Sequence, residues 1–346
     1  MKRTKLSILG ATGYSGAELI SLLLRHPRAD IVGLHSSGKS ETPQSIADLF
    51  PRLRGRIDTP ITAPDLAAIQ ASGAEAVFLA TPHEASIHWA ADLLALPNPP
   101  AVFDLSGAFR LKSAALYPRF YGFEHDKPDL LTKAVYGLPE LNRKDIAKAD
   151  LIAVPGCYPT SAILPLAPLA KAGAIDRKRR VIVDSTSGVS GAGRSPAVKS
   201  LFCEVSLQPY NVFKHRHNPE IDIHSGTPVV FTPHLGQYDR GILSTIHIEL
   251  ADRWDGPRVD STLHAAYDNE QFVRLLPEGT WPSVAGVRGT NFCDIRWAVD
   301  EANKHLIIVS AIDNLVKGAA GQAVQCFNLR FGFDEGTALD GGGSLA

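Results

Sequence analysis

The chain has 346 residues, of which 45% are apolar and 21% charged, and its formal net charge is -1. This length allows two domains with a large core, and the balance of apolar and charged residues is typical of a globular protein. The near-zero net charge excludes the usual electrostatic signature of proteins that bind nucleic acid or an anionic membrane surface. The most apolar stretch, 162–170, contains two prolines, so we expect no membrane span.

The positions of the cysteines and the first residues of the chain indicate the cellular compartment and whether the protein binds a metal. Cysteines stand at 157, 203, 293 and 326, and no two of them form a C-x-x-C pair. Scattered cysteines argue against a zinc site or a disulfide scaffold and fit a reducing cytoplasm. The first predicted strand begins at residue 5, with no signal-peptide pattern before it. We therefore predict a cytoplasmic protein that binds no metal.

The first strand and helix enclose a glycine-rich turn. Residues 5–9 are typical of a buried strand and 17–24 of a helix with an apolar face. Glycines between a strand and a helix let the backbone approach a pyrophosphate, which the helix N-terminus then binds. The spacing is G-x-x-G-x-x-G, and a turn with only a structural role is the alternative. The residues assigned to cofactor binding are Gly10, Thr12, Gly13, Tyr14, Ser15 and Gly16.

The end of the second predicted strand, 31–34, indicates which dinucleotide binds. An NAD site usually has Asp or Glu here, which binds the ribose 2′-hydroxyl. This chain has Ser36, Ser37 and Lys39 instead, and no carboxylate between 35 and 40. Two hydroxyls and an ammonium can bind a 2′-phosphate. The sequence therefore favours NADP(H) over NAD(H), with an ordinary polar loop as the alternative.

Further strands are predicted at 76–80, 101–105 and 151–154, and helical segments separate them. This alternation predicts a parallel, helix-flanked sheet, which binds ligands at the carboxyl ends of its strands. Arg110 follows one such end and is a candidate for binding a carboxylate or phosphate bidentately. A surface ion pair is the alternative for this arginine.

Cys157 lies in the most informative stretch, 154–160, which reads V-P-G-C-Y-P-T. A strand runs into a Pro-Gly turn, and helix-start signals follow the cysteine. A helix N-terminus stabilises a thiolate and so lowers the pKa of a cysteine placed there, and its N–H groups can bind an oxyanion. A buried small residue at a strand–helix junction is the alternative. Cys203, Cys293 and Cys326 lack this context and are interpreted as structural.

Beyond about residue 175 the alternation of strand and helix gives way to longer strands. Strands are predicted at 181–184, 229–232, 242–250, 293–299 and 306–312, and helices at 258–269 and 317–328. This pattern indicates a mostly antiparallel or mixed sheet. The small-residue loop 185–194 suits phosphate or nicotinamide contacts, and a plain mobile loop is the alternative. From these segments Ser187, Gly188 and Asn328 are assigned to cofactor binding.

The densest cluster of functional side chains is 214–220, which reads K-H-R-H-N-P-E. A cysteine nucleophile needs a base or an imidazolium partner, and histidine carries protons near neutral pH. His215 and His217 would point the same way in an extended segment. The basic residues favour an anionic substrate, and Arg216 and Glu220 are assigned to substrate binding. A solvated charged turn is the alternative. Together, the cysteine, the NADP site and the histidine predict an oxidoreductase that acts on an aldehyde or an acyl group through a thioester.

Motifs along nearly the whole chain resemble those of the N-acetyl-gamma-glutamyl-phosphate reductases, which catalyse the third step of arginine biosynthesis. The length is similar to that of the longer of the family's two size types. One departure is Gly107-Ala108 ahead of Arg110, where many members have Ala-Asp. The motifs are G-A-T-G-Y-S-G-A-E-L at 10–19, Y-G-L-P-E-L-N at 136–142, P-G-C-Y-P-T at 155–160, S-G-V-S-G-A-G-R at 187–194, H-R-H with P-E-I at 215–221, and K-G-A-A-G-Q-A at 317–323.

The resemblance implies NADPH-dependent reduction of N-acetyl-glutamyl 5-phosphate to the 5-semialdehyde, with Cys157 as nucleophile and His217 as acid/base. It also implies a fold similar to aspartate-semialdehyde and glyceraldehyde-3-phosphate dehydrogenases, and a homo-dimer or homo-tetramer. The fold class expected is α/β, a Rossmann-type NADP-binding domain plus an α+β catalytic and dimerisation domain. The domains expected are 1–156 with 315–335 for NADP, 157–314 for catalysis, and a flexible tail, 336–346.

Two other functions stay open at this level. A related reductase could act on carrier-linked aminoadipyl phosphate or on aspartyl phosphate, because one methylene gives only about 1–3 kcal/mol of discrimination. A carrier protein would need a docking surface, of which the net charge gives no sign. An inactive NADP-binding regulatory protein is the alternative from another class. The presence of both Cys157 and His217 argues against it.

Overall fold

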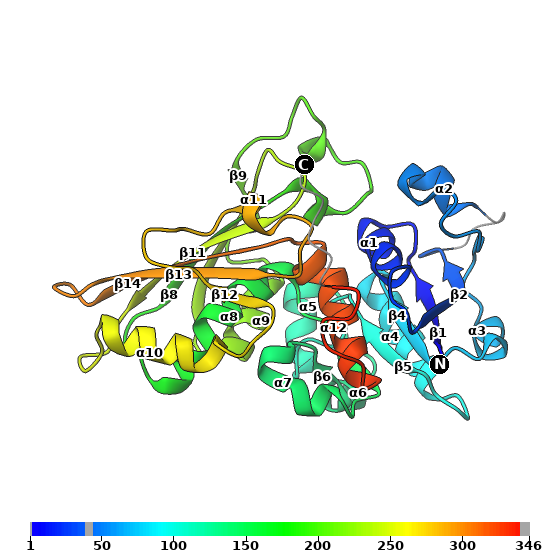
Figure 1. The fold of residues 1–346 in the computed structure, drawn as a ribbon, viewed down its shortest axis with the longest axis horizontal. Helices are drawn as coiled ribbons and strands as arrows, with labels where there is room; N and C mark the ends of the chain where they lie inside the picture. Colours follow the sequence, from blue (N-terminus) through cyan, green and yellow to red (C-terminus); the bar gives the residue numbers. More distant parts are fainter. Residues whose placement is uncertain (1, 39–43, 340–346) are drawn as a thin grey trace. The chain divides into compact units, whose positions relative to one another are not determined.

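The computed structural model describes residues 2–38 and 44–339. Contacts divide these residues into two compact units (Figure 1). Residues up to 156, together with those from 319 onward, form the first unit, and 157–318 form the second. These units are close to the two domains expected from the sequence. Lys39 and most of the expected tail, 336–346, lie outside the described residues.

The first unit is built on a seven-stranded parallel sheet with the strand order β3-β2-β1-β4-β5-β7-β6 among the described residues. This order, with strands leading outward on both sides of β1 and β4, is that of a Rossmann-type sheet and confirms the predicted class. The strands are β1 (Thr4–Leu9), β2 (Ala29–His35), β3 (Ile61–Thr62), β4 (Ala76–Leu79), β5 (Ala101–Asp104), β6 (Val135–Tyr136) and β7 (Leu151–Ala153).

Helices connect these strands, and the chain returns to the first unit in α12, which packs against α1, α7 and β5. Phe327 of α12 lies 5.9 Å from Phe78 and 6.1 Å from Phe103 between ring centroids, so the returning helix completes the core. The α-helices are α1 (Tyr14–Leu23), α2 (Ile46–Leu49), α3 (Leu66–Ser72), α4 (His83–Leu94), α5 (Tyr117–Tyr121), α6 (Pro128–Lys133), α7 (Pro139–Ile146) and α12 (Gly321–Arg330), with short 3₁₀ turns at Pro51–Leu53 and Ala114–Leu116.

The second unit contains a seven-stranded mixed sheet, again counted over the described residues, in the order β12-β13-β14-β11-β8-β10-β9. Pairs β8–β10 and β12–β13 are parallel, and the other neighbours are antiparallel. Side chains of β11 alternate between buried and half-buried, because one face packs on α8. The strands are β8 (Val181–Ser187), β9 (Gln208–Pro209), β10 (Val229–Leu235), β11 (Ile242–Glu249), β12 (Val273–Leu275), β13 (Cys293–Asp300) and β14 (His305–Ile312).

The long strands β11, β13 and β14 lie side by side, and α8 and α10 lie along one side of them (Figure 1). This arrangement confirms the expected second sheet. The helices are α8 (Cys157–Ala172), α9 (His217–Ser225), α10 (Gly256–Tyr267) and α11 (Val284–Val287), with 3₁₀ turns at Val189–Ala192 and Val198–Ser200 and a π-helical turn at Val316–Ala320.

Helix α8 runs for 16 residues in spite of two internal prolines. A proline has no N–H, so the carbonyl four residues earlier loses its helical donor. The two carbonyls affected are those of Ser161 and Leu164. The Ser310 hydroxyl donates to the first at 2.6 Å, and the Tyr267 hydroxyl donates to the second. Side chains from β14 and α10 therefore keep the helix continuous back to its first residue.

The segment expected as a loop from residue 185 begins three residues later. Ser185 and Ser187 belong to β8, which pairs with β10 and β11 through Ser187. Their small polar side chains are typical of a loop, but both are buried. Ser185 bonds to Ser244 of β11 at 2.6 Å, and Ser244 bonds to Ser161 at 2.7 Å. Mutual hydrogen bonding offsets the cost of burying these hydroxyls, so the strand can include them.

Candidate active site

Cys157 is the first residue of α8 and follows directly on the Pro-Gly turn after β7. It is half-buried at the N-terminus of a long helix. Gly318 packs against it from the π-helical turn. A Cβ atom on Gly318 would lie 2.7 Å from the Cβ of Cys157, which no real contact allows. Only glycine fits behind this cysteine.

A cavity of about 240 Å³ opens beside Cys157 within the second unit. It brings together five residues assigned from the sequence: Cys157, Ser187, Gly188, Arg216 and His217. These residues come from α8, the end of β8 and the start of α9, which lie far apart in the chain. The cavity is lined by Cys157, Tyr158, Ser187, Gly188, Gly191, Ala192, Lys199, Gln208, Tyr210, Asn211, His215, Arg216, His217 and Leu235.

The two histidines of the 214–220 cluster lie together, although the segment is not extended. His217 begins helix α9, and the His215 ring lies 4.8 Å from its ring between centroids. The backbone N–H of His217 donates to His215 Nδ1 at 3.1 Å. An orphan N–H at a helix start requires such an acceptor, which is why the segment turns into a helix here. His215 thus acts as a cap for α9.

Burial and, to a smaller extent, the nearby charges of Arg216 and Lys199 together lower the pKa of His215 to about 3. The rings of Tyr158 and Tyr210 pack edge-on against it at 5.7 and 5.4 Å. His215 is therefore neutral at physiological pH and its Nδ1 serves as an acceptor. A neutral His215 cannot serve as a proton donor at that pH.

The buried, neutral state of His215 predicts how stability depends on pH. Its folded pKa of about 3 is below the unfolded value of 6.5, so the unfolded state binds more protons between these values. The contribution of the neutral His215 ring to the free energy of unfolding is fully present above about pH 6.5 and is lost as the pH falls toward 3. We expect the wild type to lose about 2 kcal/mol more than His215→Asn between pH 6.5 and 4.5, because asparagine does not titrate. Denaturant unfolding at both pH values measures this difference, and parallel losses in the two proteins would contradict the assignment.

The cavity carries two cationic and two phenolic side chains. Arg216 and Lys199 both line it. Tyr210 donates to the Tyr158 hydroxyl at 3.1 Å, and Tyr158 donates to the carbonyl of His234 at 3.0 Å. Burial raises the pKa of Tyr210 to about 12, so this phenol is neutral. Two cations beside neutral donors suit an anionic substrate.

Lys199, Gln208, Tyr210 and Asn211 line the cavity but were not predicted. They come from the excursion 198–213, which has little regular structure beyond one 3₁₀ turn and the two residues of β9. No periodicity or motif marks them in the sequence. Residues 207–213, directly before the 214–220 cluster, read L-Q-P-Y-N-V-F, a mixture of polar and apolar residues that gives no such signal.

Arg110 and Glu220, both assigned to substrate binding, are buried. Arg110 donates from Nε to the carbonyl of Val154 and from Nη2 to that of Leu105, each at 2.8 Å. It thereby ties the end of β5 to the residue before the Pro-Gly-Cys turn. Glu220 lies in the first turn of α9, is fully buried, and is not among the residues that line the cavity. The Arg110 guanidinium therefore binds backbone carbonyls of the first unit.

Two family models match the chain. The model described as semialdehyde dehydrogenase, NAD binding domain, matches residues 5–149, and the model described as semialdehyde dehydrogenase, dimerisation domain, matches 157–314. N-acetyl-gamma-glutamyl-phosphate reductases from Tolumonas auensis and Yersinia pestis are 48% and 50% identical to it, over 96% of this chain and 98% of each relative. The chain belongs to the N-acetyl-gamma-glutamyl-phosphate reductase family. The resemblance of its motifs to that family is confirmed, and the chain is an oxidoreductase of the semialdehyde dehydrogenase type.

Solved structures show the same fold at low sequence identity. Aspartate semialdehyde dehydrogenase II from Vibrio cholerae, in complex with ASA, matches with a TM-score of 0.70 and 18% identity over 95% of this chain and 98% of its own. Aspartate semialdehyde dehydrogenase with NADP from Candida albicans matches with a TM-score of 0.66 and 16% identity, over 95% of this chain and 98% of its own. At these identities the likeness concerns the fold.

The glycine turn of this reductase-family chain fits the pyrophosphate of a dinucleotide. Gly10 has φ of +88°, and a Cβ on it would lie 2.2 Å from the Ala80 carbonyl oxygen. A Cβ on Gly16 would lie 2.4 Å from the Gly10 carbonyl oxygen. Helix α1 then begins after Gly13 with no side-chain cap and no acidic residue in its first turn. No acidic side chain in this first turn would therefore repel an anion bound at the helix N-terminus.

Other residues assigned to the cofactor lie in different settings. Ser36 is almost fully buried, and its hydroxyl donates to the carbonyl of Gly38, whereas Ser37 is exposed. Asn328 is fully buried in α12. Its Oδ1 lies 2.9 Å from His26 Nε2, and its Nδ2 donates to two backbone carbonyls. The amide of Asn328 therefore binds protein groups, and we do not include it in the proposed cofactor site.

The other three cysteines differ in their burial. Cys293 and Cys326 are fully buried, as structural cysteines are, whereas Cys203 is exposed and is not part of the core. Within 2–38 and 44–339, no cluster of three or more His, Cys, Asp or Glu side chains is arranged to hold a metal. In the same ranges, none of the helices has both the length and the apolar character needed to cross a membrane.

Proposed function

We propose that this chain reduces N-acetyl-L-glutamyl 5-phosphate to N-acetyl-L-glutamate 5-semialdehyde with NADPH and releases phosphate. The observation that carries the proposal is the cavity that Cys157, His217 and Arg216 line together. The names of relatives at 48% and 50% identity support the choice of substrate. The position of Cys157 at a helix start supports the reaction type.

Cys157 is the proposed nucleophile. Its sulfur attacks the acyl carbon, a C–S bond forms, and the bond from that carbon to the phosphate oxygen breaks, so phosphate leaves with the electron pair. N–H groups at the start of α8 stabilise the oxyanion that forms during this attack. NADPH, when bound, supplies the hydride that reduces the resulting thioester. The sulfur takes the electron pair back when the C–S bond of the thiohemiacetal breaks and the semialdehyde is released.

His217 is the proposed acid/base. Its imidazolium gives a proton to the carbonyl oxygen as the thioester is reduced, and its imidazole takes that proton back when the thiohemiacetal collapses. His217 lines the cavity at the start of α9. His215 lines it too, but its Nδ1 accepts from the backbone and its pKa is lowered to about 3, so it cannot hold a proton at neutral pH.

The charge of the substrate is matched by the two cations at the cavity, Arg216 and Lys199. Arg216 was assigned to substrate binding from the sequence, and we add Lys199. Arg110 acts through its contact with the Val154 carbonyl, which supports the turn before Cys157. A substrate with a carboxylate at one end and a phosphate at the other can form an ion pair with each cation, whereas a neutral ester can form none.

The reaction is tested by comparing three acyl phosphates as substrates. N-acetyl-glutamyl, aminoadipyl and aspartyl phosphates differ in chain length and in the group on the α-nitrogen. We expect turnover of the first to exceed that of the other two by at least about tenfold in kcat/KM, the discrimination that one methylene or one missing contact provides. Preference for either of the others would replace the proposed substrate and leave the thioester chemistry in place.

NADPH is the proposed cofactor, held by the turn from Gly10 to Gly16 and selected by Ser36, Ser37 and Lys39. Ser187 and Gly188, which line the cysteine cavity, are proposed to contact its reacting end. We expect kcat/KM to be higher with NADPH than with NADH. Ser36→Asp should shift this ratio toward NADH by at least about tenfold, because a carboxylate repels the 2′-phosphate. Steady-state kinetics with both cofactors measures the ratio, Ser45→Asp serves as a control for added charge, and equal efficiency of the wild type with both would refute the choice.

A homo-dimer or homo-tetramer is the proposed assembly. The dimerisation-domain model that matches 157–314 supports an oligomer. Phe202 and Phe213 are 95% and 64% exposed on the excursion 198–213, and partner contact would remove such side chains from water. Sedimentation of the purified chain distinguishes dimer from tetramer.

A further inference from the structure

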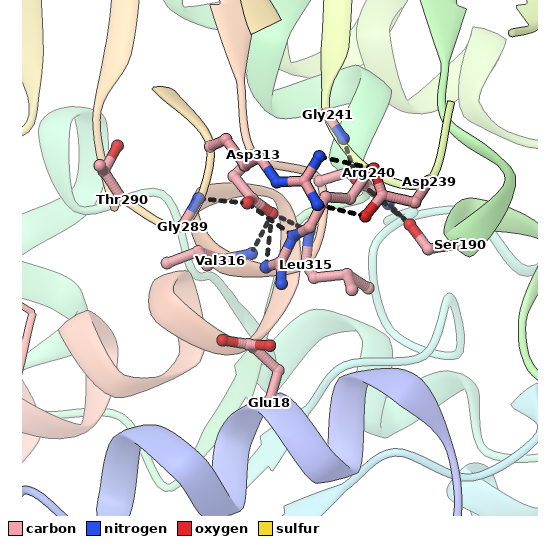
Figure 2. Close-up of polar contacts among 12 residues, drawn as sticks. Glu18, Ser190, Asp239, Arg240, Gly241, Gly289, Thr290, Asp313, Leu315 and Val316 are labelled. Carbon is pink, nitrogen blue, oxygen red and sulfur yellow. Dashed lines mark hydrogen bonds and ion pairs between the residues drawn. The ribbon is translucent and has the colours of Figure 1, made fainter. Parts of the chain in front are cut away.

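A buried ion pair lies at the end of β14, outside the residues that line the cavity. Asp313 is fully buried, and its Oδ1 accepts from Arg240 Nη2 at 2.9 Å and from the backbone N–H groups of Leu315 and Val316 at 2.9 and 3.2 Å. Its Oδ2 accepts from the Gly289 N–H at 2.6 Å and lies 2.8 Å from Arg240 Nε. Figure 2 shows these groups converging on the one carboxylate. Both oxygens of the Asp313 carboxylate therefore have partners.

One side of this pair fixes the turn that packs against the cysteine. The Asp313 carbonyl accepts from the N–H of Gly318 at 3.0 Å, and the Asp313 carboxylate holds the residues between them. Gly318 is the residue that leaves no room for a side chain beside the Cβ of Cys157. A shift of Asp313 therefore displaces Gly318, which packs directly against Cys157.

The other side fixes the loop that forms a wall of the cavity. Gly188 donates to the Gly241 carbonyl, and Ser190 donates to the Asp239 carbonyl, each at 2.9 Å, so the loop is bonded to the residues on both sides of Arg240. Asn314, next to Asp313, accepts from the Gly241 N–H at 2.6 Å and donates to the Ser190 hydroxyl at 3.0 Å. Figure 2 labels Ser190, Asp239 and Gly241 around the pair.

We propose that the Asp313–Arg240 ion pair positions the cysteine cavity, because it fixes both the turn behind Cys157 and the loop from Gly188 to Ala192. Neither charged residue lines the cavity, so both act through the groups that they hold. A buried ion pair contributes little net stability compared with apolar residues of the same shape, but it holds its partners in one geometry. The role in turnover rests on the proposed function.

A second arginine–aspartate pair in the same unit provides a matched control. Arg274 Nε lies 2.6 Å from Asp294 Oδ1, and its Nη2 donates to Oδ2 at 2.9 Å. The Asp294 side chain is 5% exposed, and the pair joins β12 to β13 without lining the cavity. Arg240→Gln and Arg274→Gln therefore each remove one partner of a buried carboxylate, but only the first touches the proposed positioning contacts.

The test compares three quantities in these two variants: thermal stability, kcat/KM, and the rate at which iodoacetamide alkylates Cys157. We expect both variants to melt at lower temperature than the wild type. At a temperature where both are folded, Arg240→Gln should lower kcat/KM by about 10- to 100-fold, as misplacement of a site by about 1 Å does, and change the alkylation rate at least about threefold. Arg274→Gln should change neither quantity by more than about twofold. Arg240→Lys, which keeps the charge, should recover part of the loss.

Equal kinetic losses in Arg240→Gln and Arg274→Gln would overturn the proposal, and so would an unchanged alkylation rate in Arg240→Gln. If Arg240→Gln does not fold, Ser190→Ala tests the same loop. That variant removes only the hydroxyl that accepts from Asn314, and we expect about a threefold loss of kcat/KM with no change in melting temperature. No loss would then refute the loop contact. A wild type without activity on N-acetyl-glutamyl phosphate would refute the proposed function, and the alkylation rates would still report on positioning.

Discussion

We expect Cys157→Ser to retain less than about one-thousandth of the wild-type turnover, as other enzymes do when they lose their nucleophile. A serine hydroxyl is a poor nucleophile near neutral pH unless a dedicated base activates it, and the start of α8 supplies N–H groups rather than a base. Serine is a favoured residue at helix starts, so the fold should be preserved. Steady-state assay of the purified variant measures the loss.

Two controls separate loss of the nucleophile from loss of the fold. NADPH binding, followed by fluorescence titration, should be unchanged, because the glycine turn at Gly10 belongs to the other unit. Cys203→Ser removes an exposed cysteine and should keep full turnover. Activity of Cys157→Ser at more than a few per cent of the wild type would rule out the thioester route.

The second large effect is expected at His217. His217→Asn should lower turnover by roughly two to four powers of ten, which is the contribution of a positioned acid/base. Asparagine can still donate and accept hydrogen bonds at the start of α9 but cannot carry a proton. The change of turnover with pH that reflects protonation of the acid/base should also disappear from the pH–rate profile. Turnover measured from acid to alkaline pH in the variant and the wild type tests both statements.

His215→Asn is the matched control for this histidine. Its ring is already neutral and serves as an acceptor for the His217 N–H, a role that an asparagine oxygen can take over. We therefore expect a much smaller loss of turnover and an unchanged pH–rate profile. If His215→Asn proved the more damaging change, the roles of the two histidines would be reversed.

Much of the first unit could be predicted because its signals are local. Buried strands such as β1 and β4 are continuous apolar runs, and Gly10 and Gly16 mark close backbone approaches that the structure contains. The position of Cys157 at a helix start also follows from its neighbours in the chain. Such features depend on a few consecutive residues, so the sequence alone is sufficient.

Features that depend on distant partners were missed or misread. Ser185 has the composition of a loop residue and lies in a strand, because Ser244 provides a buried hydrogen bond from 59 residues away. The contacts of Arg110, a candidate for substrate binding, with backbone carbonyls were missed, because only the folded sheet brings these groups near. His217 begins a helix, and its backbone N–H donates to His215, which the sequence did not indicate. In each case the deciding partner is not visible as a local pattern.

The candidate active site also combines residues that local motifs indicate with residues that depend on distant contacts. The proposed nucleophile and acid/base, Cys157 and His217, lie in sequence motifs, whereas Lys199 and Tyr210 lie in a segment without any. Asp313 and Arg240 are 73 residues apart, and neither belongs to a motif. Their connection to Cys157 depends on three-dimensional contacts through Gly318, so only the structure indicates a role for them.

The central claim is that Cys157 carries the substrate as a thioester, and the reverse reaction without phosphate tests it directly. The enzyme is mixed with N-acetyl-glutamate 5-semialdehyde and NADP⁺ in phosphate-free buffer, and NADPH formation is followed before the protein is digested for mass spectrometry. We predict a burst of one NADPH per active site, then arrest, with one N-acetylglutamyl group on the peptide that contains Cys157, and renewed turnover when phosphate is added. Steady NADPH formation without an adduct, or an adduct on another residue, would contradict the account.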